Sequence, residues 1–109
     1  MRRGDIVAVA DPGGDYSGKP RPAVIVQSDV FNPTHPSMTV CLITGVLTGY
    51  SLFRVPAPSD DVTGLEKMSE VEVDKVQAIR SHRVGRAIGR MPDDVMAEID
   101  MALKRWLDL

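Results

Sequence analysis

The chain of 109 residues contains one cysteine, and aromatic side chains make up only 5% of it. A single cysteine excludes an internal disulfide and any zinc site built from several cysteines. The sequence also lacks an apolar run of about 20 residues, the length of a membrane span. Its first residues, Met-Arg-Arg-Gly-Asp, lack the apolar region of a signal peptide. We therefore expect no membrane association, a cytoplasmic location and an aliphatic core.

Length and charge narrow the expectations further. A chain of this size predicts one domain over residues 1–109, since chains divide into domains only at roughly twice that length. The formal net charge of −2 argues against a general nucleic-acid binder. However, residues 75–92 contain five basic residues and His82 but no acidic residue. This segment is either a local positive surface or a solvated basic edge strand that resists aggregation.

Short runs rich in valine and isoleucine, bordered by glycine or proline, predict strands. The predicted strands cover residues 4–10, 24–27, 39–44, 51–55, 71–76 and 84–90, with a turn at 81–83. Because the apolar runs are continuous rather than alternating, we expect burial on both faces of the sheet.

The C-terminal segment has a helical period instead. Apolar residues recur on one face between Val95 and Leu107, which predicts a helix over residues 92–107. Trp106 on that face is interpreted as a core residue or a dimer anchor. Short strands followed by one amphipathic helix indicate a mainly β fold with helices, in which a small β-barrel is closed by the C-terminal helix.

An arginine stands at the mouth of the second predicted strand, in the run Arg21-Pro-Ala-Val-Ile-Val-Gln-Ser-Asp29. Pro20 and Pro22 flank Arg21 and bias it toward extended geometry, so its guanidinium projects from a defined place. The preceding segment is rich in glycine. A fixed cation beside such a loop indicates an anion site. The alternative is a structural ion pair with Asp15 or Asp29.

Several motifs, taken in order and spacing, resemble the MazF/PemK/Kid toxins. They are Arg3-Gly-Asp-Ile-Val, Arg21-Pro-Ala-Val-Ile-Val-Gln-Ser-Asp, Leu42-Ile-Thr44, Val73-Asp-Lys-Val76 and Ile88-Gly-Arg-Met91. The closing helix also resembles the end of that family, so the match runs nearly from end to end.

The resemblance implies the toxin of a type II toxin–antitoxin pair, with an SH3-like barrel of the CcdB/PemK type that acts as a homodimer. Most such toxins are metal-independent endoribonucleases that cut single-stranded RNA, including mRNA, and thereby inhibit translation and growth. The products carry a 2′,3′-cyclic phosphate and a 5′-hydroxyl. Because the 2′-OH of the substrate is the nucleophile, the protein needs only positioning, charge stabilisation and proton transfer. We expect no cofactor, no metal ligands and a cognate antitoxin as partner.

The resemblance also carries over to individual residues. Arg21 matches the catalytic arginine and is expected to stabilise charge on the scissile phosphate. Thr44 matches a threonine or serine whose hydroxyl binds a phosphate oxygen or the 2′-OH; the alternative is a buried threonine bonded to backbone. Asp74 matches the acidic residue of an Asp-Gln pair that helps to hold the RNA. Lys75 replaces the glutamine of that pair and can only donate hydrogen bonds.

Four further residues are candidates for contact with RNA. Tyr16 and Lys19 lie in the loop before Arg21, Ser28 follows the second predicted strand, and His82 lies in the basic segment. Cys41 lies inside an apolar run, which is typical of a small buried residue rather than a nucleophile.

Two other functions stay open at this point. A toxin of the same barrel, as in CcdB, can poison DNA gyrase without catalysis, because fold alone does not decide function. A degenerate homologue that binds an antitoxin without activity is the other alternative.

Overall fold

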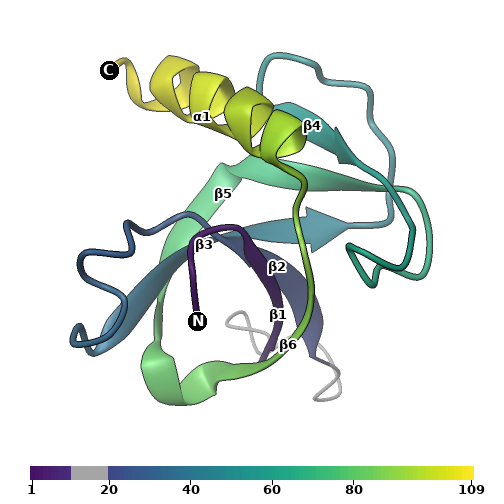
Figure 1. The fold of residues 1–109 in the computed structure, drawn as a ribbon. Coiled ribbons are helices and arrows are strands. Elements are labelled where there is room, and N and C mark those ends of the chain that lie inside the picture. Colours follow the sequence, from purple (N-terminus) through teal and green to yellow (C-terminus); the bar gives the residue numbers. More distant parts are fainter. Residues whose placement is uncertain (11–19) are drawn as a thin grey trace.

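The computed structural model describes residues 1–10 and 20–109. Six strands form one sheet in the order β4-β5-β3-β2-β1-β6, and all neighbouring strands are antiparallel (Figure 1). The elements are β1 (Asp5–Val9), β2 (Arg21–Ile25), β3 (Ser37–Thr44), β4 (Arg54–Ala57), β5 (Ser69–Arg80), the 3-10 turn η1 (Ser81–Arg83), β6 (Val84–Arg90) and α1 (Asp93–Leu107). The predicted mainly β fold with one C-terminal helix is confirmed.

The second, fourth and fifth strands differ from the sequence prediction. The second strand was predicted at residues 24–27, but β2 begins at Arg21 and ends at Ile25, so the prediction was shifted toward the C-terminus. The predicted strand at residues 51–55 was wrong in its first half, because β4 begins only at Arg54. The backbone N–H groups of Phe53 and Arg54 both donate to the carbonyl of Tyr50, which closes a turn before the strand. β5 extends well beyond the predicted residues 71–76. Its pairing with β3 shifts in register between Cys41 and Leu42.

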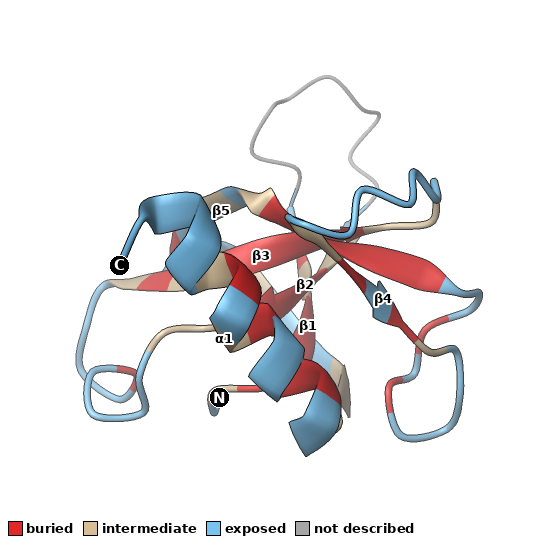
Figure 2. Ribbon diagram, turned by 90° about the horizontal axis from the view of Figure 1, so that it is seen from above, coloured by how far each residue is buried: buried red, intermediate tan, exposed pale blue. Residues whose placement is uncertain are grey.

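Both faces of the sheet are buried, as predicted. One apolar cluster lies beneath α1 and includes Ile6, Val24, Val71 and Ile99. The second cluster lies on the other side of the strands and includes Val7. Figure 2 shows the buried residues of α1 on the side that faces the sheet. Continuous apolar strands are thereby explained, because neighbouring residues point to opposite faces and both faces need apolar side chains.

The helix α1 begins immediately after Pro92, which occupies the N-cap position. Asp93 and Asp94 lie in the first turn, and Lys104 and Arg105 lie in the last turn, as the helix dipole favours. The buried side chains recur at helical spacing; they are Val95, Met96, Ile99 and Ala102. No helix in the part of the chain that the structure describes has the length and apolar character of a membrane span.

The loop between β4 and β5 connects the two edge strands of the sheet, β4 and β6. No hydrogen-bonded ladder joins β4 to β6 among the described residues. Instead, the N–H of Arg90 in β6 donates to the carbonyl of Val62 at 2.8 Å. Gly89 lies so close to the backbone of Thr63 that a Cβ atom at this position would overlap it. The loop between β4 and β5 thus covers the edge of β6 and completes a barrel-like shape.

The Arg3-Gly-Asp motif joins the first strand to the last. Gly4 has a φ of +94°, a conformation that favours glycine. This turn presents the carbonyl of Arg3 and the carboxylate of Asp5 to the guanidinium of Arg90, which donates to them at 3.1 and 3.0 Å. The motif therefore ties the start of β1 to the end of β6.

Candidate functional site

The pairing of β2 with β3 brings Arg21 level with Thr44. Ala23 lies opposite Leu42 in this antiparallel pair. Two residues further along the strands, Arg21 therefore comes opposite Thr44 on the same face of the sheet. Nη2 of Arg21 also donates to the carbonyl oxygen of Ile43 at 3.4 Å. The two residues expected to act on the phosphate are thus neighbours across two strands.

A row of acidic side chains lies beside this pair. Glu70, Glu72 and Asp74 occupy alternate positions of β5, so they project from the same side of the strand. Nη2 of Arg21 donates to Oε1 of Glu72 at 2.7 Å. The alternative ion pair of Arg21 with Asp29 is therefore wrong.

The carboxylate of Asp29 has other donors. It accepts from the backbone N–H of Arg3 at 2.7 Å and from the side chain of Asn32 at 3.0 Å. These two hydrogen bonds lower the pKa of Asp29 below its ordinary value. Asp29 thus stabilises the turn after β2. Asp15, the other partner considered for Arg21, lies outside the described residues.

A second arginine, Arg54 of β4, holds the acidic row together. Its Nε lies 2.7 Å and its Nη2 3.2 Å from the two carboxylate oxygens of Asp74. It also lies 3.5 Å from Glu72 and 3.8 Å from Glu70. The hydrogen bond to Asp74 is the largest influence on the guanidinium and raises its pKa, against the opposing effect of burial. Arg54 is therefore a permanent internal cation.

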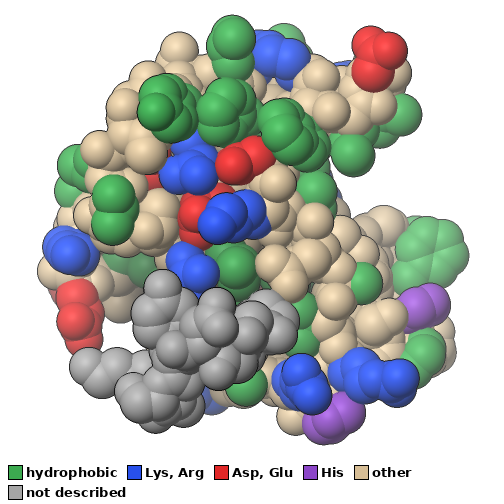
Figure 3. Space-filling view, turned by 180° about the vertical axis from the view of Figure 1, so that it is seen from behind, with side chains coloured by type: hydrophobic (Ala, Val, Ile, Leu, Met, Phe, Trp, Pro, Cys, Tyr) green, Lys and Arg blue, Asp and Glu red, His purple; other side chains and the backbone are tan. Residues whose placement is uncertain are grey.

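Lys75 completes the group, with its Nζ 3.9 Å from Oε2 of Glu72. We call the six residues Arg21, Arg54, Lys75, Glu70, Glu72 and Asp74 the charged cluster. Its three cations and three anions balance formally. Figure 3 shows charged side chains of both signs gathered on one face, next to hydrophobic side chains. Because Lys75 and Arg21 are 54% and 27% exposed and the side chain of Glu72 only 6%, an approaching anion meets the cations first.

Burial and hydrogen bonds oppose one another at two of the carboxylates. Burial alone would raise the pKa of Glu70, but donors from Gly49 and Thr48, together with Arg54, outweigh it and lower that pKa. At Asp74 burial likewise acts to raise the pKa, and the hydrogen bond from Arg54 prevails and lowers it. Both groups are therefore ionised at neutral pH.

Thr44 ends β3 and is half-buried. Its Oγ1 accepts a hydrogen bond from the N–H of Val46 at 3.1 Å. The contact to backbone that the alternative interpretation expected is therefore present. It uses a lone pair of the hydroxyl, so the O–H still has its hydrogen to donate to a phosphate or ribose oxygen.

The structure separates two other predicted residues from this site. Ser28 follows the far end of β2 and its Oγ accepts from the N–H of Val30, within a turn. His82 lies in η1, next to Ser81, which donates hydrogen bonds to the carbonyls of Pro36 and His35. These two residues precede the N-terminal end of β3, whereas Thr44 lies at its C-terminal end. The remaining two candidates, Tyr16 and Lys19, lie outside the described residues.

Sequence reasoning missed Arg54, Glu70 and Glu72. Arg54 falls within a predicted strand and the glutamates at or near the start of another, but the sequence does not say which residues face each other. The pairing of Arg54 opposite Glu72 across β4 and β5 brings their charges together. The alternation Glu70, Glu72, Asp74 was the one available signal, since such spacing places charges on one side of a strand.

Aromatic residues form a small group beside the charged cluster. The ring of Phe53 lies 5.5 Å from that of Tyr50 and 5.6 Å from that of Trp106, between centroids. Trp106 remains 48% exposed, so its interpretation as a core residue is wrong. Leu47 and Leu52, from the loop before β4, are also exposed. We call these five residues the apolar surface.

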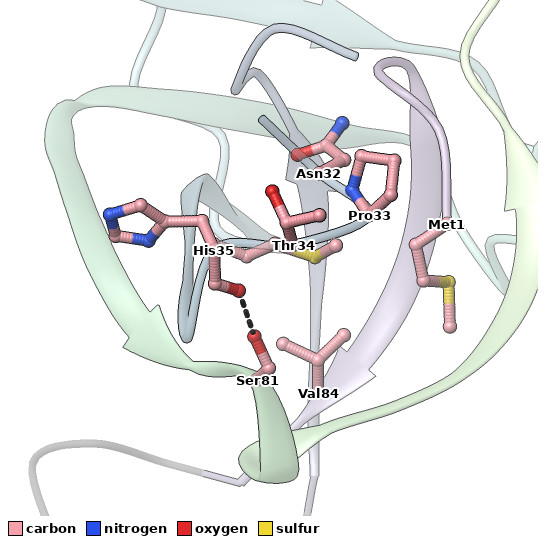
Figure 4. A pocket seen from close by; sticks show the side chains of 8 residues that line it. Met1, Asn32, Pro33, Thr34, His35, Ser81 and Val84 are labelled. Atoms are coloured by element: carbon pink, nitrogen blue, oxygen red, sulfur yellow. Dashed lines mark hydrogen bonds between the residues drawn. The ribbon is translucent and has the colours of Figure 1, made fainter. Parts of the chain in front are cut away.

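A pocket of about 360 Å³ lies away from the charged cluster, between the turn after β2 and the start of β6 (Figure 4). Its wall includes Asn32, Thr34, His35 and Ser81. Neither Arg21 nor any other member of the charged cluster lines it. The candidate site is therefore an open surface rather than this pocket. Within residues 1–10 and 20–109, no group of three His, Cys, Asp or Glu side chains is arranged to hold a metal ion.

Comparisons with known proteins agree on one family. A family model described as PemK-like, MazF-like toxin of type II toxin-antitoxin system matches residues 2–107. The chain is 37% identical over 109 residues to a probable endoribonuclease MazF of Mycolicibacterium smegmatis. The match covers 100% of this chain and 98% of that protein.

Solved structures lead to the same family. The Mycobacterium tuberculosis toxin MazF-mt6 matches with a TM-score of 0.80 and 28% identity, over 95% of this chain and 97% of that chain. A chain of the MazE-MazF crystal structure (Form-II) from Deinococcus radiodurans matches with a TM-score of 0.81 and 25% identity, over 100% of this chain and 96% of that chain.

Proposed function

Because the chain belongs to the PemK-like, MazF-like toxin family of type II toxin–antitoxin systems, we propose that it is an endoribonuclease that cleaves single-stranded RNA at specific sequences. The observation that carries this proposal is the position of Arg21, partly exposed and level with Thr44 at the rim of the charged cluster. A cation and a hydroxyl at opposing positions of two paired strands suit one phosphate group. The relative from Mycolicibacterium smegmatis, named a probable endoribonuclease, supports the same activity.

The proposed reaction uses the substrate's own nucleophile. The ribose 2′-OH attacks the adjacent phosphorus, the bond to the 5′-oxygen breaks, and the ends carry a 2′,3′-cyclic phosphate and a 5′-hydroxyl. Negative charge grows on the phosphate oxygens during this step, and the planar fork of Arg21 can bind two of them. The hydroxyl of Thr44 donates to a phosphate or ribose oxygen. Neither role requires a cofactor.

Lys75 and Asp74 act differently in this proposal. Lys75 is 54% exposed, so its ammonium is available to a neighbouring phosphate. Asp74 is bound by Arg54 through both carboxylate oxygens, so it supports the site through Arg54 instead of reading bases directly. Lys75 replaces the glutamine of the family and cannot accept hydrogen bonds from a base, so it is assigned to a phosphate.

Partners and location complete the proposal. A homodimer is supported by the apolar surface around Trp106, which is larger than scattered single apolar residues would explain. A cognate antitoxin with an acidic segment is supported by the basic residues between Lys75 and Arg90. The assembled toxin and its RNA substrate would meet in the cytoplasm.

The alternative of a gyrase poison is not favoured. The relative described above is named for RNA cleavage, and the charged cluster offers a phosphate site that a purely binding toxin does not need. A degenerate homologue without activity is excluded only by an assay, which the next experiment provides.

The test is cleavage of a set of defined single-stranded RNAs in EDTA, with the ends of the products mapped. We expect cutting with cyclic-phosphate ends by the wild-type protein, and a loss of about 10²–10³ in rate for Arg21→Ala. Lys104→Ala is the matched control, because Lys104 is an exposed cation of α1 that is not a member of the charged cluster. Cleavage that needs a metal would contradict the mechanism, and an Arg21→Ala protein that cuts at the parent rate would contradict the assignment.

A further inference from the structure

Glu72 is the buried partner of the exposed arginine. Its side chain is 6% exposed, whereas that of Arg21 is 27% exposed. Among the described residues, Arg21 is the donor to Oε1 of Glu72, at 2.7 Å. The other oxygen, Oε2, lies 3.5 Å from Arg54 and 3.9 Å from Lys75. The two oxygens of one carboxylate are thus divided between the arginine at the rim and two further cations.

This division matters when a phosphate arrives. A phosphate that binds the fork of Arg21 competes with Oε1 of Glu72 for the same nitrogen. A buried carboxylate that loses its only cation becomes an uncompensated charge, which is strongly unfavourable. Glu72 escapes this outcome because Arg54 stays close to Oε2 and is itself anchored by both oxygens of Asp74.

The ion pair also restricts the guanidinium before RNA binds. A free arginine side chain has several rotatable bonds, and ordering it costs conformational entropy. Held by Glu72 and by the carbonyl of Ile43, Arg21 is already directed along the face that carries Thr44. An arginine ordered in advance loses less entropy in the transition state.

On these grounds we propose that Glu72 is a positioning residue: it orders Arg21 in the RNA-free site and yields it to the scissile phosphate, while Arg54 balances the released carboxylate. The inference rests on the proposed function. It predicts opposite effects on binding and catalysis, because the ion pair competes with the substrate in the ground state and orders the arginine for the reaction.

The test removes the charge and keeps the shape, with Glu72→Gln. We expect KM to fall about threefold to tenfold, because the neutral amide competes for Arg21 less strongly than the charge-assisted hydrogen bond of the carboxylate does. We expect kcat to fall about tenfold, the pattern of a variant that has lost ground-state competition. A merely structural role would reduce the active fraction and leave KM unchanged.

Binding is measured separately on an RNA that the wild-type protein cuts, synthesised with a 2′-deoxy nucleotide on the 5′ side of the scissile phosphate. Glu72→Gln should bind this RNA more tightly than the wild-type protein. In an Arg21→Ala background the same substitution should change the Kd by less than about twofold, because no arginine remains to be released. Glu66→Gln is the control for the loss of one negative charge, since Glu66 is an exposed residue of the loop before β5.

The outcomes separate the two proposals. If the wild-type protein neither cuts nor binds RNA, the proposed function and this inference both fail. If it cuts RNA but Glu72→Gln leaves the Kd unchanged, or tightens binding equally without Arg21, the positioning role alone is refuted. A fall in kcat with unchanged KM and a lost acidic limb of the pH profile would also refute it, in favour of direct proton transfer. Should Glu72→Gln not fold, Glu72→Asp withdraws the carboxylate from Arg21 and should shift KM and kcat in the same directions.

Discussion

Replacing Arg54 by methionine tests whether the charged cluster is held by one internal cation. The substitution keeps most of the side-chain length and removes the charge. Among the described residues, Arg21 and Lys75 then remain as the cations of the cluster beside Glu70, Glu72 and Asp74. Removing one partner of a buried ion pair costs about 3–5 kcal/mol. Because the side chains of Arg54 and Asp74 are 11% and 17% exposed, water offsets part of this. We therefore expect the lower end, about 3 kcal/mol.

The assay is urea unfolding at a fixed protein concentration, followed by the fluorescence of Trp106, which packs against Phe53 beside the mutated residue. With a urea dependence of about 1.5 kcal/mol per M, the midpoint of Arg54→Met should fall by about 2 M. Arg86→Met is the matched control, because Arg86 is exposed on the edge strand β6. The urea midpoint of Arg86→Met should stay within a few tenths of a mole per litre of the wild-type midpoint.

The loss of unfolding free energy caused by Arg54→Met should also depend on pH, and it should be larger at neutral than at acidic pH. The folded protein lowers the pKa of Asp74 and of Glu70, so their contribution to stability is present above the ordinary values near 4 and is lost as the pH falls through the folded values. The methionine variant loses the part that comes from Arg54. Its penalty should therefore be full at pH 7 and shrink as the pH falls below about 4, through the lowered pKa values of the folded protein. A penalty that is independent of pH, or equal to that of Arg86→Met, would refute the role of Arg54.

Three further predictions concern single positions. Thr44→Val removes the hydroxyl and should lower the cleavage rate about 10²-fold, whereas Thr44→Ser should retain most of it; equal rates for both would remove Thr44 from the chemistry. Burial raises the pKa of the Cys41 thiol to about 12, so Ellman's reagent at pH 8 should react only after unfolding in urea, and rapid reaction of the native protein would contradict the burial. Gly89→Ala pushes a methyl group into the backbone of Thr63 and should cost about 3 kcal/mol, against about 1 kcal/mol for Gly49→Ala, which has open space but a φ of +75°; equal urea midpoints would show that β6 and the loop do not pack this closely.

Local patterns in the sequence were sufficient for most elements. The periodic apolar residues, together with Pro92, predicted α1 to within about one residue of its bounds, because a helix is stabilised by contacts within a few positions of the chain. Strand positions followed from β-branched runs and their glycine and proline borders. The boundary of β4 failed because its turn depends on hydrogen bonds to Tyr50, which no propensity in residues 51–55 indicates.

The sequence by itself therefore determined the fold class, the family resemblance and the two residues at the centre of the candidate site, Arg21 and Thr44. Only the tertiary structure decided which charges meet: Glu72 beneath Arg21, and Arg54 between three carboxylates. It also decided that Ser28 and His82 lie elsewhere. The physical reason is register. Residues far apart in the chain become neighbours through pairing between strands, and a shift of one residue would turn every side chain to the other face.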